Sequence, residues 1–178
     1  LKVIRSLEPY TAATVASNTV RGQYSAGVVD DVQVPGYLDE DGIDDSSHTE
    51  TFVALKAKIN NWRWSGVPFY LRTGKCMHEH VTEVVITFYS LPHSIYPAVE
   101  ECESVNRLYI QLQPHERVEL HLMAKQAGDK NILKPVKLDL DLTGSNERHL
   151  DAYERLLMDV VRGNQTLFVR RDELNAAW

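Results

Sequence analysis

The sixteen residues Asn60–Lys75, NNWRWSGVPFYLRTGK, carry the strongest structural signal in this sequence. Within Val67–Arg72, apolar side chains alternate with others, which is typical of a half-buried β-strand. The predicted strand runs into Gly74 and Lys75, and a glycine beside a lysine at a strand end places an ammonium group on a turn. Lys75 is therefore a candidate ligand contact. The alternative, a solvated lysine after a core strand, stays open.

Segments on both sides of this stretch show the same two-residue period, and the Ser65-Gly66 pair before Val67 predicts a hairpin. A stretch rich in Asp, Gly, Ser and Pro, Val28–Ser47, predicts a long surface loop of a kind that is often functional or packs on a neighbouring domain. The predicted strands are Thr19–Ser25, Glu50–Trp62, Val67–Arg72, Thr82–Tyr89, Arg107–Gln113, Arg117–Lys125 and Lys134–Leu142.

Near the C-terminus the period changes to that of a helix. The stretch Leu150–Val161 carries an apolar stripe and predicts an amphipathic helix that ends before Gly163. A second helix is predicted over Asp172–Trp178. Strands followed by helices favour an α+β fold with a large, mostly antiparallel β-sheet. We expect one domain over residues 1–178, a length sufficient for a core of its own.

Composition excludes several kinds of partner. The formal net charge of −6 argues against nucleic acid or an anionic membrane as the main partner. No apolar run reaches about 18 residues, and no signal-peptide pattern opens the chain. Cys76 and Cys102 make no disulfide framework and indicate free thiols in a reducing cytoplasm. Because the first residue is Leu, we interpret the chain as an N-terminally truncated piece of a longer protein.

Common catalytic motifs are absent from the sequence. It contains no G-x-G-x-x-G, no Walker A, no H-E-x-x-H and no G-x-S-x-G. His78 and His80 would share one face of a strand, but a zinc site needs further ligands that the sequence does not offer. We therefore predict no metal site.

Seven segments resemble blocks of the C-terminal domain of the glucose-6-phosphate dehydrogenase family, and they occur in the family's order. They are TVRGQY (Thr19–Tyr24), PGYL (Pro35–Leu38), TETFVA (Thr49–Ala54), the stretch Asn60–Lys75, QLQP (Gln111–Pro114), DAYERLL (Asp151–Leu157) and FVRRDEL (Phe168–Leu174).

The resemblance implies a two-domain enzyme that oxidises glucose 6-phosphate to 6-phosphogluconolactone, with hydride transfer to NADP. An N-terminal Rossmann domain would bind the NADP, and this domain would carry part of the substrate site and a homodimer interface. The family's phosphate-gripping His-Tyr motif and its general-base His are not in this sequence. We therefore expect no catalytic residue here and no activity from these 178 residues alone.

Three residues are implied as substrate contacts. The family places a substrate-binding lysine at the end of an R-x-G-K turn, which is Arg72–Lys75 here. Five residues later the family usually has Lys or Arg, whereas this chain has His80. Either His80 keeps that role with weaker phosphate affinity and a charge that depends on pH, or the loop shifts register. Gln113 matches a glutamine that touches the sugar; the alternative is a strand-end glutamine bonded to backbone.

Some family members bind a second, structural NADP through basic residues. Arg72 matches one of these, but Gln111 stands where they carry Arg, so we expect no structural NADP. Trp62 and Trp64 are expected on one strand face, in core or interface packing and not in base stacking.

Two other interpretations remain: a non-catalytic β-sheet module for dimerisation or sugar-phosphate binding, and the substrate domain of another nicotinamide-dependent sugar dehydrogenase.

Overall fold

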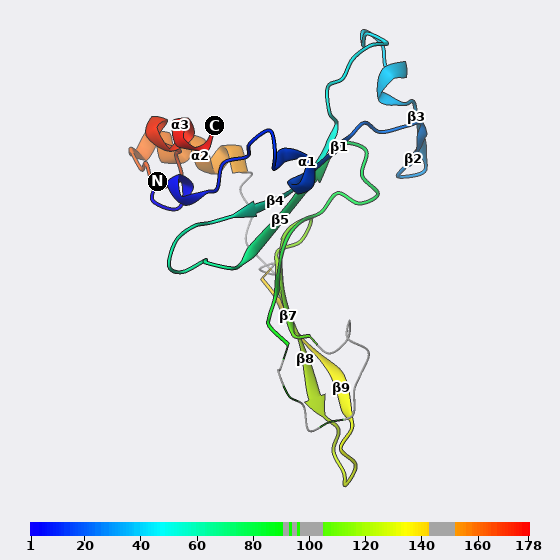
Figure 1. Cartoon of the computed structure of the whole chain (residues 1–178), viewed down its shortest axis with the longest axis vertical. Coiled ribbons are helices and arrows are strands. Elements are labelled where there is room, and N and C mark those ends of the chain that lie inside the picture. Colours follow the sequence, from blue (N-terminus) through cyan, green and yellow to red (C-terminus); the bar gives the residue numbers. More distant parts are fainter. Residues whose placement is uncertain (91–92, 94–95, 97–104, 143–151) are drawn as a thin grey trace. The chain divides into compact units, whose positions relative to one another are not determined.

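A computed structural model describes residues 1–90, 93, 96, 105–142 and 152–178 (Figure 1). The chain divides into two compact units. The first unit comprises Leu1–His78 and Leu150–Trp178, and the second comprises Glu79–His149. Cys102 and the first two residues of the predicted helix at 150–161 lie outside the described residues.

A three-stranded antiparallel sheet forms the centre of the first unit. Its strands are β1 (Thr19–Gly22), β4 (Phe52–Lys58) and β5 (Pro68–Gly74), in the order β1-β4-β5. The predicted hairpin of β4 and β5 is confirmed, with Lys56 opposite Tyr70 and its Nζ 5.6 Å from the ring centroid. As the middle strand, β4 is half-buried along all but its last residue.

The connection between β4 and β5 corrects one expectation. Trp62 and Trp64 do not lie on a strand, because β4 already ends at Lys58. Trp62 is fully exposed, whereas Trp64 packs edge-on against Phe69 with ring centroids 5.3 Å apart. Asn61 Oδ1 accepts a hydrogen bond from the Trp64 N–H at 3.0 Å, and this local bond holds a turn in place of the predicted strand end.

The predicted surface loop at residues 28–47 is partly regular. It contains β3 (Val32–Val34), which pairs with β2 (Gly27–Val29), and the 3-10 turn η2 (Tyr37–Asp39). Asp30 and Asp31 have φ of 50° and 63°, the positive values that a two-residue hairpin turn needs. Valines on both sides of an Asp-Asp pair were the signal for this hairpin.

The remaining elements of the first unit are short helices: η1 (Ile4–Ser6), α1 (Val15–Asn18), α2 (Ala152–Arg162) and α3 (Arg171–Ala177). The two predicted C-terminal helices are confirmed, and Gly163 follows α2 with φ of 68°. The amino group of Leu1 lies 3.3 Å from Glu173 Oε1, which brings the N-terminus beside α3 (Figure 1). No described helix is long and apolar enough to cross a membrane.

The second unit is a four-stranded antiparallel meander. Its strands are β6 (Thr82–Thr87), β7 (Arg107–Gln113), β8 (Arg117–Lys125) and β9 (Leu133–Asp141), paired in chain order. The α+β prediction is confirmed. The described strands, however, lie in three separate sheets of three, two and four strands, because alternation specifies a strand but not its partner across a long connection.

Candidate functional site

Lys75 is exposed in the bend that directly follows β5, as the R-x-G-K pattern predicted. The chain passes so closely here that a Cβ on Gly74 would lie 2.9 Å from Phe52 Cδ2 and 3.0 Å from Met77 Sδ. Cys76 then adopts a left-handed conformation with φ of 50°. Within the described part of the chain, no carboxylate pairs with the Lys75 ammonium, which leaves it available to an anion.

Gln113 ends β7 opposite Thr82, the first residue of β6. Thr82 Oγ1 donates a hydrogen bond to Gln113 Oε1 at 2.9 Å. This partner is a side chain and not the backbone group expected in the alternative interpretation. Because Oε1 accepts that bond, the Nε2 amino group of Gln113 is the part of the carboxamide left to meet a ligand oxygen. The peptide bond between Gln113 and Pro114 is cis.

His80 is exposed and stands two residues before Thr82, the partner of Gln113. The predicted substrate residues are thus divided between the units: Lys75 belongs to the first, and His80 and Gln113 belong to the second. His78 and His80 do not lie on a strand. Among the described residues, no group of three or more His, Cys, Asp or Glu side chains could hold a metal ion.

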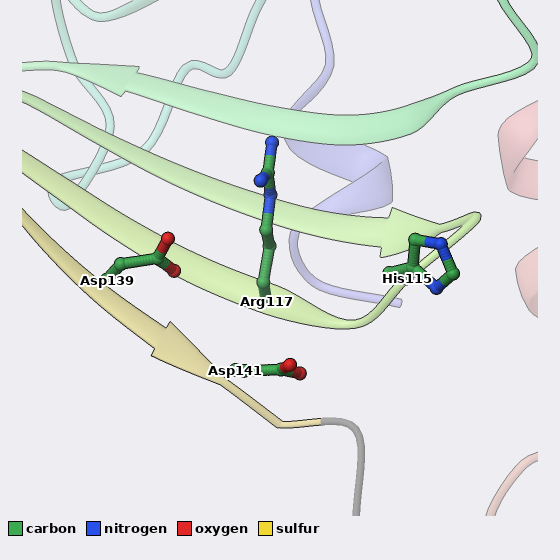
Figure 2. A pocket seen from close by; sticks show the side chains of 4 residues that line it. All are labelled: His115, Arg117, Asp139 and Asp141. Carbon is green, nitrogen blue, oxygen red and sulfur yellow. The ribbon is translucent and has the colours of Figure 1, made fainter.

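A hollow of about 350 Å³ lies on the second unit, and none of its lining residues is one of the predicted substrate contacts. Figure 2 shows Arg117 reaching from β8 across the sheet, Asp139 and Asp141 on β9, and His115 in the turn between β7 and β8. Two carboxylates in the lining oppose an anionic ligand, so we do not assign a sugar phosphate to this hollow.

Glu119 was missed by the sequence analysis and is the best-buried charge among the described residues, with 6% of its surface exposed. Its Oε1 accepts a hydrogen bond from Lys137 Nζ at 2.7 Å and forms an ion pair with Arg117 Nη1 at 3.0 Å, and its Oε2 lies 3.0 Å from His121 Nε2. Arg117 Nε also donates to Gln111 Oε1 at 3.0 Å. We call Glu119, Arg117, His121 and Lys137 the Glu119 cluster.

The signal for the Glu119 cluster was present in the sequence. Arg117, Glu119 and His121 follow one another at the two-residue period that puts them on one face of a strand. Lys137 lies on the next strand, β9, opposite His121. Only the pairing register of β8 with β9 shows that this lysine reaches the same carboxylate.

The whole chain matches a known domain. The model of the glucose-6-phosphate dehydrogenase C-terminal domain family matches residues 1–178. The chain belongs to this family. It is 54% identical to a glucose-6-phosphate 1-dehydrogenase of Rhizobium meliloti and 52% identical to one of Mycolicibacterium smegmatis, over 100% and 99% of its own length. It spans 36% of the length of each of these relatives.

Two solved structures support the assignment of this chain to the glucose-6-phosphate dehydrogenase C-terminal domain family. One is glucose-6-phosphate dehydrogenase in complex with its substrate glucose-6-phosphate, with a TM-score of 0.83 at 33% identity. The other is the enzyme of Mycobacterium avium, with a TM-score of 0.74 at 29% identity. In both cases the match covers 99% of this chain, and 35% and 34% of the solved chains.

In this glucose-6-phosphate dehydrogenase domain the Glu119 cluster links charge to stability. The hydrogen bond from Lys137, followed by that from His121, holds the pKa of Glu119 below its ordinary value of 4.5, and the bond to Glu119 raises the pKa of Lys137. A carboxyl group whose pKa is lower in the folded state stabilises that state at pH values above its unfolded pKa, and this stabilisation is lost as the pH falls through the folded pKa. A lysine whose pKa is higher in the folded state stabilises that state at pH values below its unfolded pKa, and this stabilisation is lost as the pH rises through the folded pKa.

We therefore expect the urea midpoint of the second unit to fall as the pH is lowered from about 6 to about 3, through the range where carboxyl groups titrate. In Glu119→Gln this acid limb should flatten, because the substituted side chain no longer titrates. The midpoint can be measured at each pH from the far-ultraviolet circular dichroism signal of the β-sheet. Parallel acid limbs in the two proteins would show that other carboxylates cause the acid loss.

Proposed function

We propose that the longer protein carrying this domain oxidises glucose 6-phosphate to a 6-phosphogluconolactone and passes the hydride to NADP, the first step of the pentose phosphate pathway. The observation that carries the proposal is the family match over residues 1–178, together with the exposed, unpaired Lys75 at the strand end. The names of the relatives, all glucose-6-phosphate 1-dehydrogenases, support the same reaction.

In this proposal the domain supplies some of the residues that bind the substrate and no catalytic residue. Lys75 offers a compact positive charge with several donors to the phosphate or a sugar hydroxyl. Gln113 offers its Nε2 donors to the sugar, and His80 contributes a further hydrogen bond. Binding energy gathered at these remote groups would orient the sugar C1 against the nicotinamide. The NADP is held mainly outside residues 1–178, and we propose no structural NADP on this domain.

The test is NADP reduction by the full-length protein with glucose 6-phosphate, and with glucose as the control. Rapid turnover with the phosphate alone would support the reaction and the role of this domain in substrate binding. No turnover from a folded full-length protein would overturn the proposal. The function would then move to the non-catalytic module, whose binding of glucose 6-phosphate can be measured by calorimetry.

His80 gives a prediction for phosphate affinity. We expect His80→Arg to lower the KM for glucose 6-phosphate about threefold, because it adds a permanent charge where the family usually carries one. His78→Arg, an exposed neighbour, is the matched control. An unchanged KM for His80→Arg would remove His80 from the substrate site.

We also propose that the protein lies in the cytoplasm, where an exposed thiol such as Cys76 stays reduced. There we expect it to form a homodimer through the β-sheet. The support is an apolar face on the second unit that carries exposed large side chains on three of its strands. Sedimentation of the full-length protein tests the dimer, and a monomer at micromolar concentration would contradict it. The exposed side chains of this face are Val84, Ile86, Leu112, Leu138 and Leu140.

A further inference from the structure

Thr51, the residue before β4, uses all of its polar groups to join three segments of the first unit. Its N–H donates to Gly22 O at 2.9 Å, and its carbonyl accepts the N–H of Lys75 at 2.8 Å. Its hydroxyl accepts the N–H of Tyr24 at 3.0 Å. Thr51 is half-buried, so these bonds are partly shielded from competing water.

The Tyr24 end of this junction is itself held firmly. Tyr24 O accepts the N–H of Tyr37 at 3.0 Å, and the two rings meet edge to face with centroids 5.9 Å apart. The Tyr24 hydroxyl donates to Glu40 Oε1 at 2.9 Å, and this bond raises the pKa of Tyr24 to about 12. Gln23 Nε2 donates to Ser47 O and Thr49 O, both at 2.9 Å. The hydroxyl of Thr51 is therefore bonded to a fixed peptide.

The Lys75 end is less constrained along its own chain. β5 ends at Gly74, a residue with more backbone freedom than any other, and Cys76 turns the chain away in a left-handed conformation. Among the described residues, the bond to Thr51 O is the backbone hydrogen bond that fixes the Lys75 peptide. Any rotation of the Thr51 peptide would move this bond and, with it, the Cα of Lys75.

We propose that Thr51 is a positioning residue for substrate binding: its hydroxyl, anchored on the Tyr24 peptide, keeps its carbonyl directed at the Lys75 N–H and so fixes the origin of the Lys75 side chain. This inference rests on the proposed role of Lys75 as a substrate contact. It adds a residue that touches no substrate and acts through Lys75.

The test compares Thr51→Val with Thr51→Ser in the full-length protein. Valine keeps the shape and the backbone carbonyl but removes the hydroxyl acceptor, whereas serine keeps the acceptor. We expect Thr51→Val to raise the KM for glucose 6-phosphate about fivefold, which corresponds to one hydrogen bond of about 1 kcal/mol. The kcat should change less than about twofold. Thr51→Ser should retain a KM near that of the wild type.

A double-mutant cycle separates positioning from a general structural effect. On a Lys75→Ala background, Thr51→Val should raise the KM no further, because Thr51 acts only through Lys75. A full fivefold increase on that background, or an unchanged KM for Thr51→Val alone, would overturn the inference while the proposed function stands. An unchanged KM for Lys75→Ala itself would remove both proposals about Lys75.

Amide hydrogen exchange gives a readout that does not depend on activity, and its wild-type measurement does not require the valine variant to fold. In the wild type and in Thr51→Ser, the Lys75 and Tyr24 amides should exchange slowly compared with the neighbouring Cys76 amide. In a folded Thr51→Val protein, both should exchange faster together. Fast exchange of the Lys75 amide in the wild type would overturn the inference, since the bond to Thr51 would then fix nothing.

Discussion

Replacing Lys75 by alanine in the full-length protein should raise the KM for glucose 6-phosphate at least about tenfold, equivalent to about 1.4 kcal/mol. The structure leaves this ammonium exposed at the end of β5, with no described carboxylate paired to it. An unpaired ammonium can give its full charge to a phosphate, whereas a lysine already in an ion pair would first lose that partner. Steady-state kinetics over a wide range of substrate concentration measure the change.

Lys58 offers a matched control for this experiment. It ends β4 in the same unit, and its ammonium pairs with Glu8 at 3.8 Å. Lys58→Ala should leave the KM within about twofold of the wild type, because both partners are solvated and such pairs contribute little. Equal increases in KM for Lys58→Ala and Lys75→Ala would mean that the enzyme responds to net charge and not to a contact at Lys75.

The largest effect on stability is expected at Glu119. Glu119→Gln should lower the free energy of unfolding of the second unit by about 2 kcal/mol, the range for hydrogen bonds to charged groups. The substitution leaves Arg117 and Lys137 close together without the anion between them. Their half-exposed side chains keep water access, which limits the cost compared with a fully buried charge. Urea unfolding of the full-length protein near neutral pH measures the loss.

Asp139→Asn is the control for the charge change alone. The Asp139 carboxylate lies 3.6 Å from the same Lys137 Nζ, but its side chain is 47% exposed. We therefore expect a small loss for Asp139→Asn, of at most about 0.5 kcal/mol. Equal losses for Asp139→Asn and Glu119→Gln would contradict the special role of burial at Glu119.

The sequence alone determined the type and place of most elements. The segments β7 and β8 were predicted with their observed bounds, because strict alternation over seven and nine residues has no other good solution. The position of Lys75 was also readable, since a glycine before a lysine marks the end of a strand. Seven ordered blocks gave the family, and the family match over the whole chain confirmed it.

Two other features were missed although they are local. The hairpin of β2 and β3 was hidden in a polar stretch, since its two strands have only three residues each. The strong pattern of Trp62 and Trp64 suggested a strand face, but a local hydrogen bond to Asn61 formed a turn instead.

Sequence by itself therefore determined which residues form strands and helices, the α+β class and the lysine on its turn, because period and turn chemistry act over a few neighbouring residues. Tertiary structure alone decided that Glu119 is surrounded by three basic side chains and that Thr51 holds Lys75. Both follow from register and long-range pairing: Lys137 stands 18 residues beyond Glu119, and each meets the other only because β8 and β9 pair in one register of many.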